Sequence, residues 1–238
     1  VGDLETLDLE LILADLETVE RRLEKTRRTA KAQPKEAAAE LALLESLEEA
    51  LQRGDRAAGW AAEDETHAAL VQELHLLTAK PRLYVANVDE ETLPDGGPHA
   101  AVVAAAAEAE GAEFIVLSAQ LEMELAEWPA EEAAEYRAGV GLERSGLEAL
   151  VWSSYRTLGL ITFFTIVGGQ EVRAWPVEEG APAPEAAGRV HTDMARGFIR
   201  AEVIEWRKLV EAGGWAIARE RGLVHTEGRD YIVQDGDV

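Results

Sequence analysis

Apolar side chains recur every three or four positions along about the first fifty residues of the chain. From residue 7 to residue 32 this spacing predicts one long helix with a narrow apolar stripe, typical of a coiled-coil seam. The stripe consists of Leu9, Ile12, Leu16, Val19, Leu23 and Thr26. Gln33-Pro34 should end this helix, because proline lacks a backbone N–H and restricts the residue before it. The spacing resumes over residues 35–52, so we expect a second, antiparallel helix and an exposed helical hairpin.

The pattern changes near residue 62, where predicted helices begin to alternate with short apolar runs. Apolar runs at 81–87 and 113–118 have the length of strands, and an alanine-rich helix is predicted between them at 97–109. A strand, a helix and a second strand of this kind indicate buried parallel strands of an α/β sheet. Further helices are predicted at about 62–78, 129–137 and 145–157.

The last third of the chain has the pattern of a small α+β domain. Residues 158–165 are rich in β-branched and aromatic side chains, and Gly168-Gly169 leads from them into an alternating segment at 171–175. This combination predicts a β-hairpin. The other predicted elements are a helix at 184–189, a strand at 198–204, a helix at 205–220 interrupted by Gly213-Gly214, and a short strand at 231–233. Their order is that of a β-grasp domain.

Composition narrows the classes of protein that fit this pattern. The 238 residues carry a formal net charge of −23, which argues against a surface that binds nucleic acid over the whole protein. No cysteine is present, so disulfides and thiolate metal sites are excluded. No apolar run is long enough to span a membrane. We therefore expect a soluble, cytoplasmic protein without a membrane partner.

One segment of this acidic chain is basic. We name it the basic run, and it consists of Arg21, Arg22, Lys25, Arg27, Arg28 and Lys31. It lies at the turn end of the predicted helical hairpin. Such a run can be a solvated helix face held by ion pairs between positions i and i+4, or it can contact RNA or the ribosome. The sequence leaves both interpretations open.

Two polar loops follow the two predicted strands. Asn87-Val88-Asp89-Glu90 comes directly after the first strand, and Ser118-Ala119-Gln120 directly after the second. Ligands of open α/β sheets bind at the carboxyl ends of the strands. GTPases hold the base with such a pair of loops, normally Asn-Lys-x-Asp and Ser-Ala-Lys. Here Val88 replaces the lysine and Glu90 the final aspartate, which should loosen the preference for guanine. An Asx-type turn is the alternative explanation of Asn87.

The phosphate half of such a site is not found in these residues. A G-x-x-x-x-G-K-[ST] loop, which would cradle the phosphates and supply a hydroxyl group to Mg²⁺, does not occur in the sequence. We therefore expect that the chain as given does not hydrolyse a nucleotide, and we assign no catalytic residue and no metal ligand. His191-Thr192-Asp193 is interpreted as a strand-edge turn, and the carboxylates from Glu122 to Glu135 as a solvated helix face.

Segments along nearly the whole chain have the form of motifs that occur together in one known family. The first two are Leu11 to Glu20 and Leu77 to Glu90. Those of the last third are Gly159 to Thr165, Glu171 to Trp175, Ala183 to Gly188, His191 to Asp193, Gly197 to Val203 and Gln234 to Val238. Together these segments resemble the YchF/Obg-like ATPases of the P-loop GTPase superfamily.

The resemblance implies a fold of three parts. These are a partial Ras-like P-loop G domain of the α/β class, an inserted antiparallel helical hairpin, and a C-terminal TGS domain, an α+β domain of the β-grasp, ubiquitin-like type. The implied bounds are 1–10 and 61–157 for the G domain, 11–60 for the hairpin, a coiled coil, and 158–238 for the TGS domain. The phosphate loop and a closing strand after Val238 would then lie outside this chain.

The resemblance also implies an activity, a site and partners. The family consists of ribosome-associated switch ATPases that prefer ATP to GTP and hydrolyse ATP to ADP and phosphate. By position, Asn87, Val88 and Glu90 would line the base, and Ser118 and Ala119 would add backbone contacts. The implied cofactor is Mg²⁺, with ligands outside this chain. The implied partners are ATP or GTP, the large ribosomal subunit, and RNA at the basic run.

Two other interpretations remain at this stage. The chain could be a non-catalytic module that binds protein or RNA through the hairpin and the β-grasp domain. It could also be an accessory segment of a tRNA synthetase or a stringent-response enzyme, since both carry TGS domains. No synthetase or nucleotidyl-transferase motif is found in the sequence.

Overall fold

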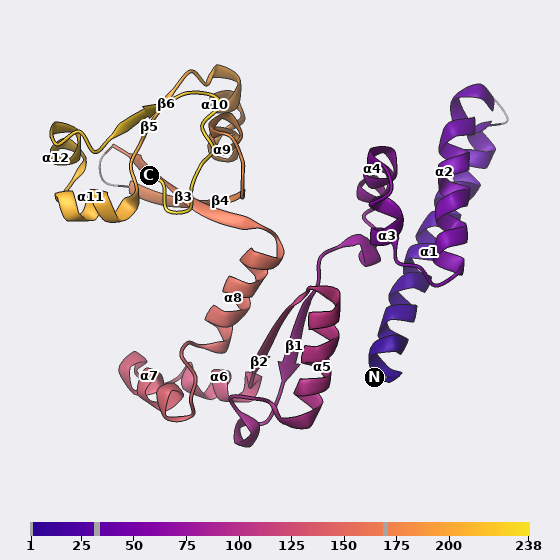
Figure 1. Ribbon diagram of the computed structural model, residues 1–238, viewed down its shortest axis with the longest axis horizontal. Coiled ribbons are helices and arrows are strands. Elements are labelled where there is room, and N and C mark those ends of the chain that lie inside the picture. The colour runs from indigo at the N-terminus through magenta and orange to yellow at the C-terminus, as the bar shows by residue number, and fades with distance from the viewer. Residues whose placement is uncertain (1, 31–33, 169–170) are drawn as a thin grey trace. The chain divides into compact units, whose positions relative to one another are not determined.

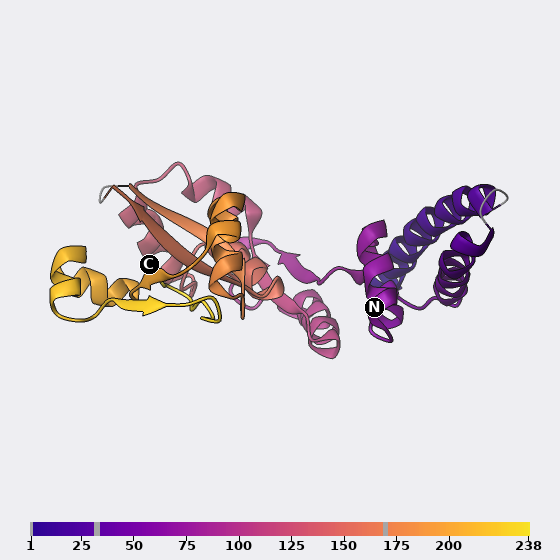
Figure 2. The same cartoon turned by 90° about the horizontal axis from the view of Figure 1, so that it is seen from above.

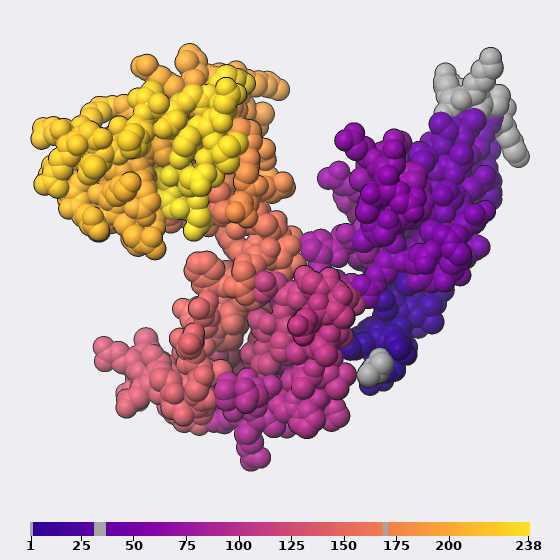
Figure 3. Space-filling view, viewed as in Figure 1, coloured from indigo at the N-terminus to yellow at the C-terminus, as the bar shows by residue number. Residues whose placement is uncertain are grey.

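The structure is a computed structural model that describes residues 2–30, 34–168 and 171–238 (Figure 1). The chain divides into two units, residues 1–82 and residues 83–238. Figure 2 shows the same elements from above, and Figure 3 shows them in space-filling form. The bounds expected for three domains, 1–10 with 61–157, 11–60 and 158–238, stay a prediction.

The first unit is built on two long helices that run antiparallel (Figure 1). Helix α1 spans Gly2–Ala30 and helix α2 spans Pro34–Gln52, while the predicted turn at residues 31–33 lies outside the described residues. Both predicted helices are present, although α1 begins earlier than the apolar stripe indicates. The apolar positions of the two helices form the core of the unit, which includes Ile12, Val19, Leu23, Leu44, Leu47 and Leu51.

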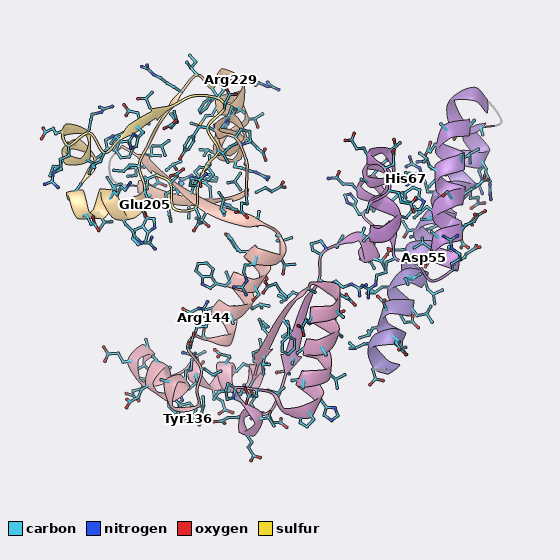
Figure 4. All side chains as sticks on the ribbon, in the orientation of Figure 1. Asp55, His67, Tyr136, Arg144, Glu205 and Arg229 are labelled. Carbon is cyan, nitrogen blue, oxygen red and sulfur yellow. The ribbon has the colours of Figure 1, made fainter. Side chains whose placement is uncertain are left out.

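Two short elements replace the single helix predicted at 62–78, and a third lies just before them. The two are α4 (Glu65–Leu74) and the 3₁₀ helix η1 (Leu77–Ala79), and the third is α3 (Ala57–Ala61). The Asp64 side chain starts α4 by accepting a hydrogen bond from the Thr66 N–H, and His75 ends it in a left-handed conformation at φ 53°. Trp60 and His67 join α3 to α4 by stacking, with ring centroids 3.8 Å apart; Figure 4 labels His67.

A buried carboxylate joins η1 to the middle of α1. Asp15 is only 2% exposed. It accepts hydrogen bonds from the backbone N–H groups of Leu77 and Thr78, at 2.6 and 2.8 Å, and from the Thr78 hydroxyl at 2.7 Å. The Thr78 hydroxyl oxygen accepts in turn from the Ala57 N–H at 2.9 Å, which ties α3 into the same network. Burial of this side chain is tolerated because both of its oxygens accept hydrogen bonds.

The first half of the second unit contains the predicted strand, helix and strand. Strands β1 (Leu83–Asn87) and β2 (Glu113–Leu117) are parallel, and Leu83 pairs with Glu113 and Asn87 with Leu117. The strands are half-buried instead of fully buried, and Val85 is 42% exposed, because each strand is an edge of a two-stranded sheet. The other elements of this half are η2 (Glu90–Thr92), α5 (Gly97–Glu110), α6 (Ala119–Leu125), α7 (Ala130–Gly139) and α8 (Gly146–Thr157).

The second half of this unit begins with the predicted β-hairpin. Strands β3 (Leu160–Val167) and β4 (Glu171–Glu178) are antiparallel, with Phe163 opposite Trp175. The elements that follow are α9 (Ala183–Val190), α10 (Thr192–Gly197), β5 (Ala201–Val203), α11 (Trp206–Ala212), α12 (Trp215–Glu220) and β6 (His225–Glu227). The helix interruption predicted at Gly213-Gly214 is therefore present.

Two expectations for this half were wrong, and one strand pairing was not predicted. The strand predicted at 231–233 is one isolated bridge between Pro182 and Ile232, because the chain turns at Gln234, whose N–H bonds to the Asp237 carboxylate. The partner of β5 is β6, which no apolar pattern indicated. The turn predicted at 191–193 is the start of α10, where the His191 ring nitrogen accepts a hydrogen bond from the Asp193 N–H.

Candidate functional site

The two loops singled out in the sequence lie next to each other at one edge of the β1–β2 sheet. The strands are parallel and in register up to their last residues, so both chains leave the sheet at the same edge. The Val88 N–H extends the ladder by donating to the Leu117 carbonyl oxygen at 2.9 Å. The carboxyl-end position, where open α/β sheets bind ligands, is thus formed by residues 87–90 and 118–120.

A side chain joins the two loops directly. The Asn87 amide oxygen accepts a hydrogen bond from the Ala119 N–H at 2.9 Å. An Asx-type turn would have used this oxygen within residue 87's own loop. The structure instead bonds it to a residue 32 positions away. Asn87 therefore holds the two loops together, and its amide NH₂ group remains as a donor on an exposed residue.

Ser118 and Ala119 lie where β2 leads into α6. Ser118 is 4% exposed, and its hydroxyl oxygen accepts from the Leu121 N–H at 3.4 Å as the N-cap of α6. Its side chain is consequently occupied and turned away from solvent. Ala119 and Gln120 are exposed at the first positions of that helix. What this loop offers to a ligand is the main chain.

Glu90 has a partner that the sequence did not indicate. Its carboxylate accepts a hydrogen bond from the hydroxyl group of Tyr136 on α7, which Figure 4 labels. This hydrogen bond and the negative charge of Glu90 raise the pKa of Tyr136 above its ordinary value. The Tyr136 ring also makes an edge contact with Trp128, at 5.4 Å between centroids. Val88, between Asn87 and Glu90, is half-buried.

A second carboxylate, that of Glu122, joins the three helices next to the two loops. Glu122 of α6 accepts from the Gly146 N–H at 2.7 Å and from the Arg137 guanidinium at 3.1 Å, so it links α6, α7 and α8. It was expected on a solvated helix face, but its side chain is only 19% exposed. Gly146 permits this packing, since a Cβ there would lie 3.0 Å from the Leu117 Cβ. The start of α8 therefore packs against Leu117, the last residue of β2.

The basic run of the first unit is largely paired with carboxylates. Arg21 and Arg28 pair with Glu17 and Glu24 one helical turn earlier, the i,i+4 pattern of a solvated face. Two further arginines reach across the unit, as Arg22 pairs with Glu40 and Glu73, and Arg27 with Glu45. Lys25 makes no ion pair with any residue that the structure describes. Lys31 lies outside the described residues.

Comparison with known proteins decides the family. The family model YchF-GTPase_C, described as a protein of unknown function (DUF933), matches residues 160–238. The protein named ribosome-binding ATPase YchF of Bacillus subtilis (strain 168) is 46% identical over 240 residues, which cover 100% of this chain and 65% of the relative. The protein of the same name from Escherichia coli O157:H7 is 40% identical over 238 residues, covering 99% of this chain and 64% of the relative.

A solved structure agrees with these sequences. The structure of the Schizosaccharomyces pombe YchF GTPase superposes with a TM-score of 0.80 at 27% identity, over 100% of this chain and 64% of that one. This chain belongs to the YchF family of Obg-like P-loop GTPases. The resemblance drawn from the sequence is thereby confirmed, as is the mixed α/β class of the fold.

The YchF relatives are longer proteins, since this chain spans 64–65% of the length of those named here. No helix among the described residues is long and apolar enough to cross a membrane. Within the same residues no cluster of three or more histidine, aspartate or glutamate side chains could hold a metal ion.

Proposed function

We propose that the intact protein is a ribosome-associated, nucleotide-dependent switch ATPase that prefers ATP to GTP and hydrolyses ATP to ADP and phosphate in the cytoplasm. The observation that carries this proposal is the 2.9 Å hydrogen bond from the Ala119 N–H to the Asn87 amide oxygen. This hydrogen bond joins the loops that follow β1 and β2, and a purine base requires such adjacent loops because it would contact both. The relatives named ribosome-binding ATPase support the proposal.

The chemistry of the proposed base site follows from the groups that remain available. The Asn87 amide NH₂ group can donate to a ring nitrogen of a purine. The Ala119 and Gln120 main chain lies beside it at the start of α6. Val88 offers an apolar contact where a guanine-selective protein places the stem of a lysine. Glu90 supplies the acceptor for the edge of the base. Ser118 contributes through its main chain alone.

The phosphate and metal parts of the reaction belong to residues outside this chain in our proposal. A magnesium ion with its phosphates needs several oxygen ligands, and the described residues offer no such cluster. Bound Mg²⁺ would neutralise charge on the phosphates. In this proposal, residues 87–90 and 118–120 bind and orient the base. We further propose that α1–α2 is the inserted hairpin and residues 158–238 the TGS domain, both serving as contacts with the large ribosomal subunit.

The base site is tested by replacing its central amide. Asn87→Ala in the intact protein should weaken ATP and GTP binding on the order of tenfold or more, because it removes both the donor to the base and the bond that joins the loops. Gln72→Ala is the control, since Gln72 is an exposed amide on α4 in the first unit, outside the proposed base site. Binding would be measured by calorimetric titration. Unchanged affinities for both nucleotides would reject the site and favour a non-catalytic binding module.

The ribosome contact is tested by charge reversal in the basic run. Arg27→Glu with Arg28→Glu should reduce co-sedimentation with ribosomes and reduce its dependence on salt, because each lost phosphate contact lowers the number of released counterions. The exposed ion pairs of these arginines are weak enough to be exchanged for phosphate. Arg53→Glu, at the opposite end of α2, is the control. If the double variant co-sediments with ribosomes as the wild type does, the basic run is a solvated helix face and not a ribosome contact.

A further inference from the structure

The residue that contacts Glu90 gives the proposed base site a further component. Tyr136 lies on α7, 46 positions from Glu90 in the sequence, and its hydroxyl group donates to the Glu90 carboxylate. The hydroxyl hydrogen is used in this bond, so one of the two carboxylate oxygens already has a partner before any ligand arrives. The Trp128 ring holds the Tyr136 ring from the side. Tyr136 thus has a ring contact in addition to its hydrogen bond with Glu90.

The two purine bases make different demands on a carboxylate. Guanine presents two parallel N–H donors, from N1 and from the exocyclic amine, and a carboxylate binds such a fork best with both oxygens. Adenine presents one N–H donor beside a ring nitrogen that accepts, so it needs only one carboxylate oxygen. A hydroxyl donor on the other oxygen takes one of that oxygen's two lone pairs and restricts the orientation of the carboxylate, so it weakens binding of guanine more than binding of adenine.

We propose that Tyr136 is a positioning residue for base selection, because its hydroxyl group holds one oxygen of the Glu90 carboxylate and leaves the other for the base. This inference rests on the proposed function of the loops at 87–90 and 118–120. It assigns part of the preference for ATP to a helix that lies outside both loops. The raised pKa of Tyr136 agrees with it, since the hydroxyl group stays protonated and remains a donor at neutral pH.

The variant that tests this inference is Tyr136→Phe in the intact protein. Phenylalanine keeps the ring against Trp128 and removes only the hydroxyl group. We expect the affinity for GTP, relative to that for ATP, to rise on the order of tenfold, the scale of one hydrogen bond to a charged group. Inosine triphosphate lacks the exocyclic amine of guanine, so its affinity should rise less than that of GTP. Tyr155→Phe on α8 is the control and should leave the ratio unchanged.

A double-mutant cycle separates positioning from general support of the fold. In a Glu90→Gln background, Tyr136→Phe should no longer change the ratio of GTP to ATP affinity, because Tyr136 acts through the carboxylate. An unchanged ratio in the single variant would overturn the inference, and so would an equal loss of ATP and GTP binding. If Asn87→Ala weakens binding while Tyr136→Phe leaves the ratio unchanged, the base site stands and only the role of Tyr136 fails. A wild-type protein that binds neither nucleotide overturns both.

Discussion

At the scale of single residues, the structure depends on buried polar groups that are fully paired. Asp15 is the clearest case, because three donors from Leu77 and Thr78 converge on one buried carboxylate. When one partner is removed, each buried donor or acceptor that is left unpaired lowers the free energy of unfolding by its desolvation penalty. The replacement of its neighbour Thr78 would free the Ala57 N–H in the same way.

Asp15→Ala should therefore lower the free energy of unfolding by about 3 kcal/mol or more, since several buried donors each cost about 1–3 kcal/mol when unpaired. Asp15→Asn keeps one acceptor oxygen and should cost less. Urea unfolding followed by circular dichroism measures both, with exposed Asp3→Ala as the control. A loss below about 1 kcal/mol for Asp15→Ala would show that water replaces the carboxylate.

Gly96 is a second residue whose identity is imposed by its surroundings. Its φ is +76°, and a Cβ there would lie 2.5 Å from the Ala100 Cβ and 3.0 Å from a methyl group of Val116 on β2. Gly54 has a similar φ of +86° with no atom within 4 Å of that position. A comparison of Gly96 with Gly54 therefore distinguishes the cost of backbone strain from the cost of crowding.

Gly54→Ala should cost about 1–2 kcal/mol of unfolding free energy, the strain of a left-handed residue with a side chain. Gly96→Ala should cost about 1–3 kcal/mol more, because crowding against Ala100 and Val116 adds to the same strain. Thermal and urea unfolding of the two variants give the comparison. Equal losses would mean that α5 shifts freely away from β2.

Tyr136 shows the limit of inference from sequence at this scale. The loops that contain Asn87, Val88, Glu90, Ser118 and Ala119 were predicted because they follow apolar runs, and parallel strands bring such loops together. The role of each residue in base binding stays a prediction. Tyr136 belongs to a helix with no motif, and only packing places its hydroxyl group on Glu90.

At the scale of elements, periodicity located most helices and strands but not the places where short helices begin. The helix predicted at 62–78 begins only after the Asp64 cap, and left-handed His75 divides it into α4 and η1. Helix α6 was missed although Ser118 is its cap, because its apolar positions are too few to show a period. Caps are single contacts between a side chain and the backbone, and they leave little trace in a hydrophobic pattern.

An ion-pair network links the start of α1 to the end of the first unit. Asp8 bonds to Arg56 and Arg82 at 2.7 and 2.6 Å. Burial opposes the charged form of Asp8, but the hydrogen bonds and positive charges of the two arginines outweigh it, and the pKa of Asp8 lies below its ordinary value. The network therefore strengthens the first unit wherever Asp8 is ionised.

The pH dependence follows from the direction of that shift. Since the folded-state pKa is below the unfolded value of about 3.9, the stability from Asp8 is present above that pH and is lost as the pH falls through the folded-state pKa. Asp8→Asn should flatten this acid loss in urea unfolding curves recorded between about pH 5 and pH 2. Asp3→Asn is the control. If Asp8→Asn loses as much unfolding free energy as the wild type when the pH is lowered, the role of Asp8 is contradicted.

At the scale of the whole molecule, family membership rests on nearly the full length of the chain, while the proposed activity rests on one edge of a two-stranded sheet. The α/β class and the hairpin of strands followed from apolar runs and glycine positions. The pairing of β5 with β6 did not, because residues 225–227 are polar and show no apolar run. The central claim is that the loops after β1 and β2 together hold a purine base.

Photo-crosslinking with an ATP analogue that carries an azido group on the adenine ring tests this claim most directly. Cleavage of the labelled intact protein at glutamate residues, followed by mass spectrometry, locates the base. The account predicts label in the peptides that contain residues 87–90 and 118–120, and competition by unlabelled ATP. Label that is competed by ATP but falls only on other peptides would contradict it.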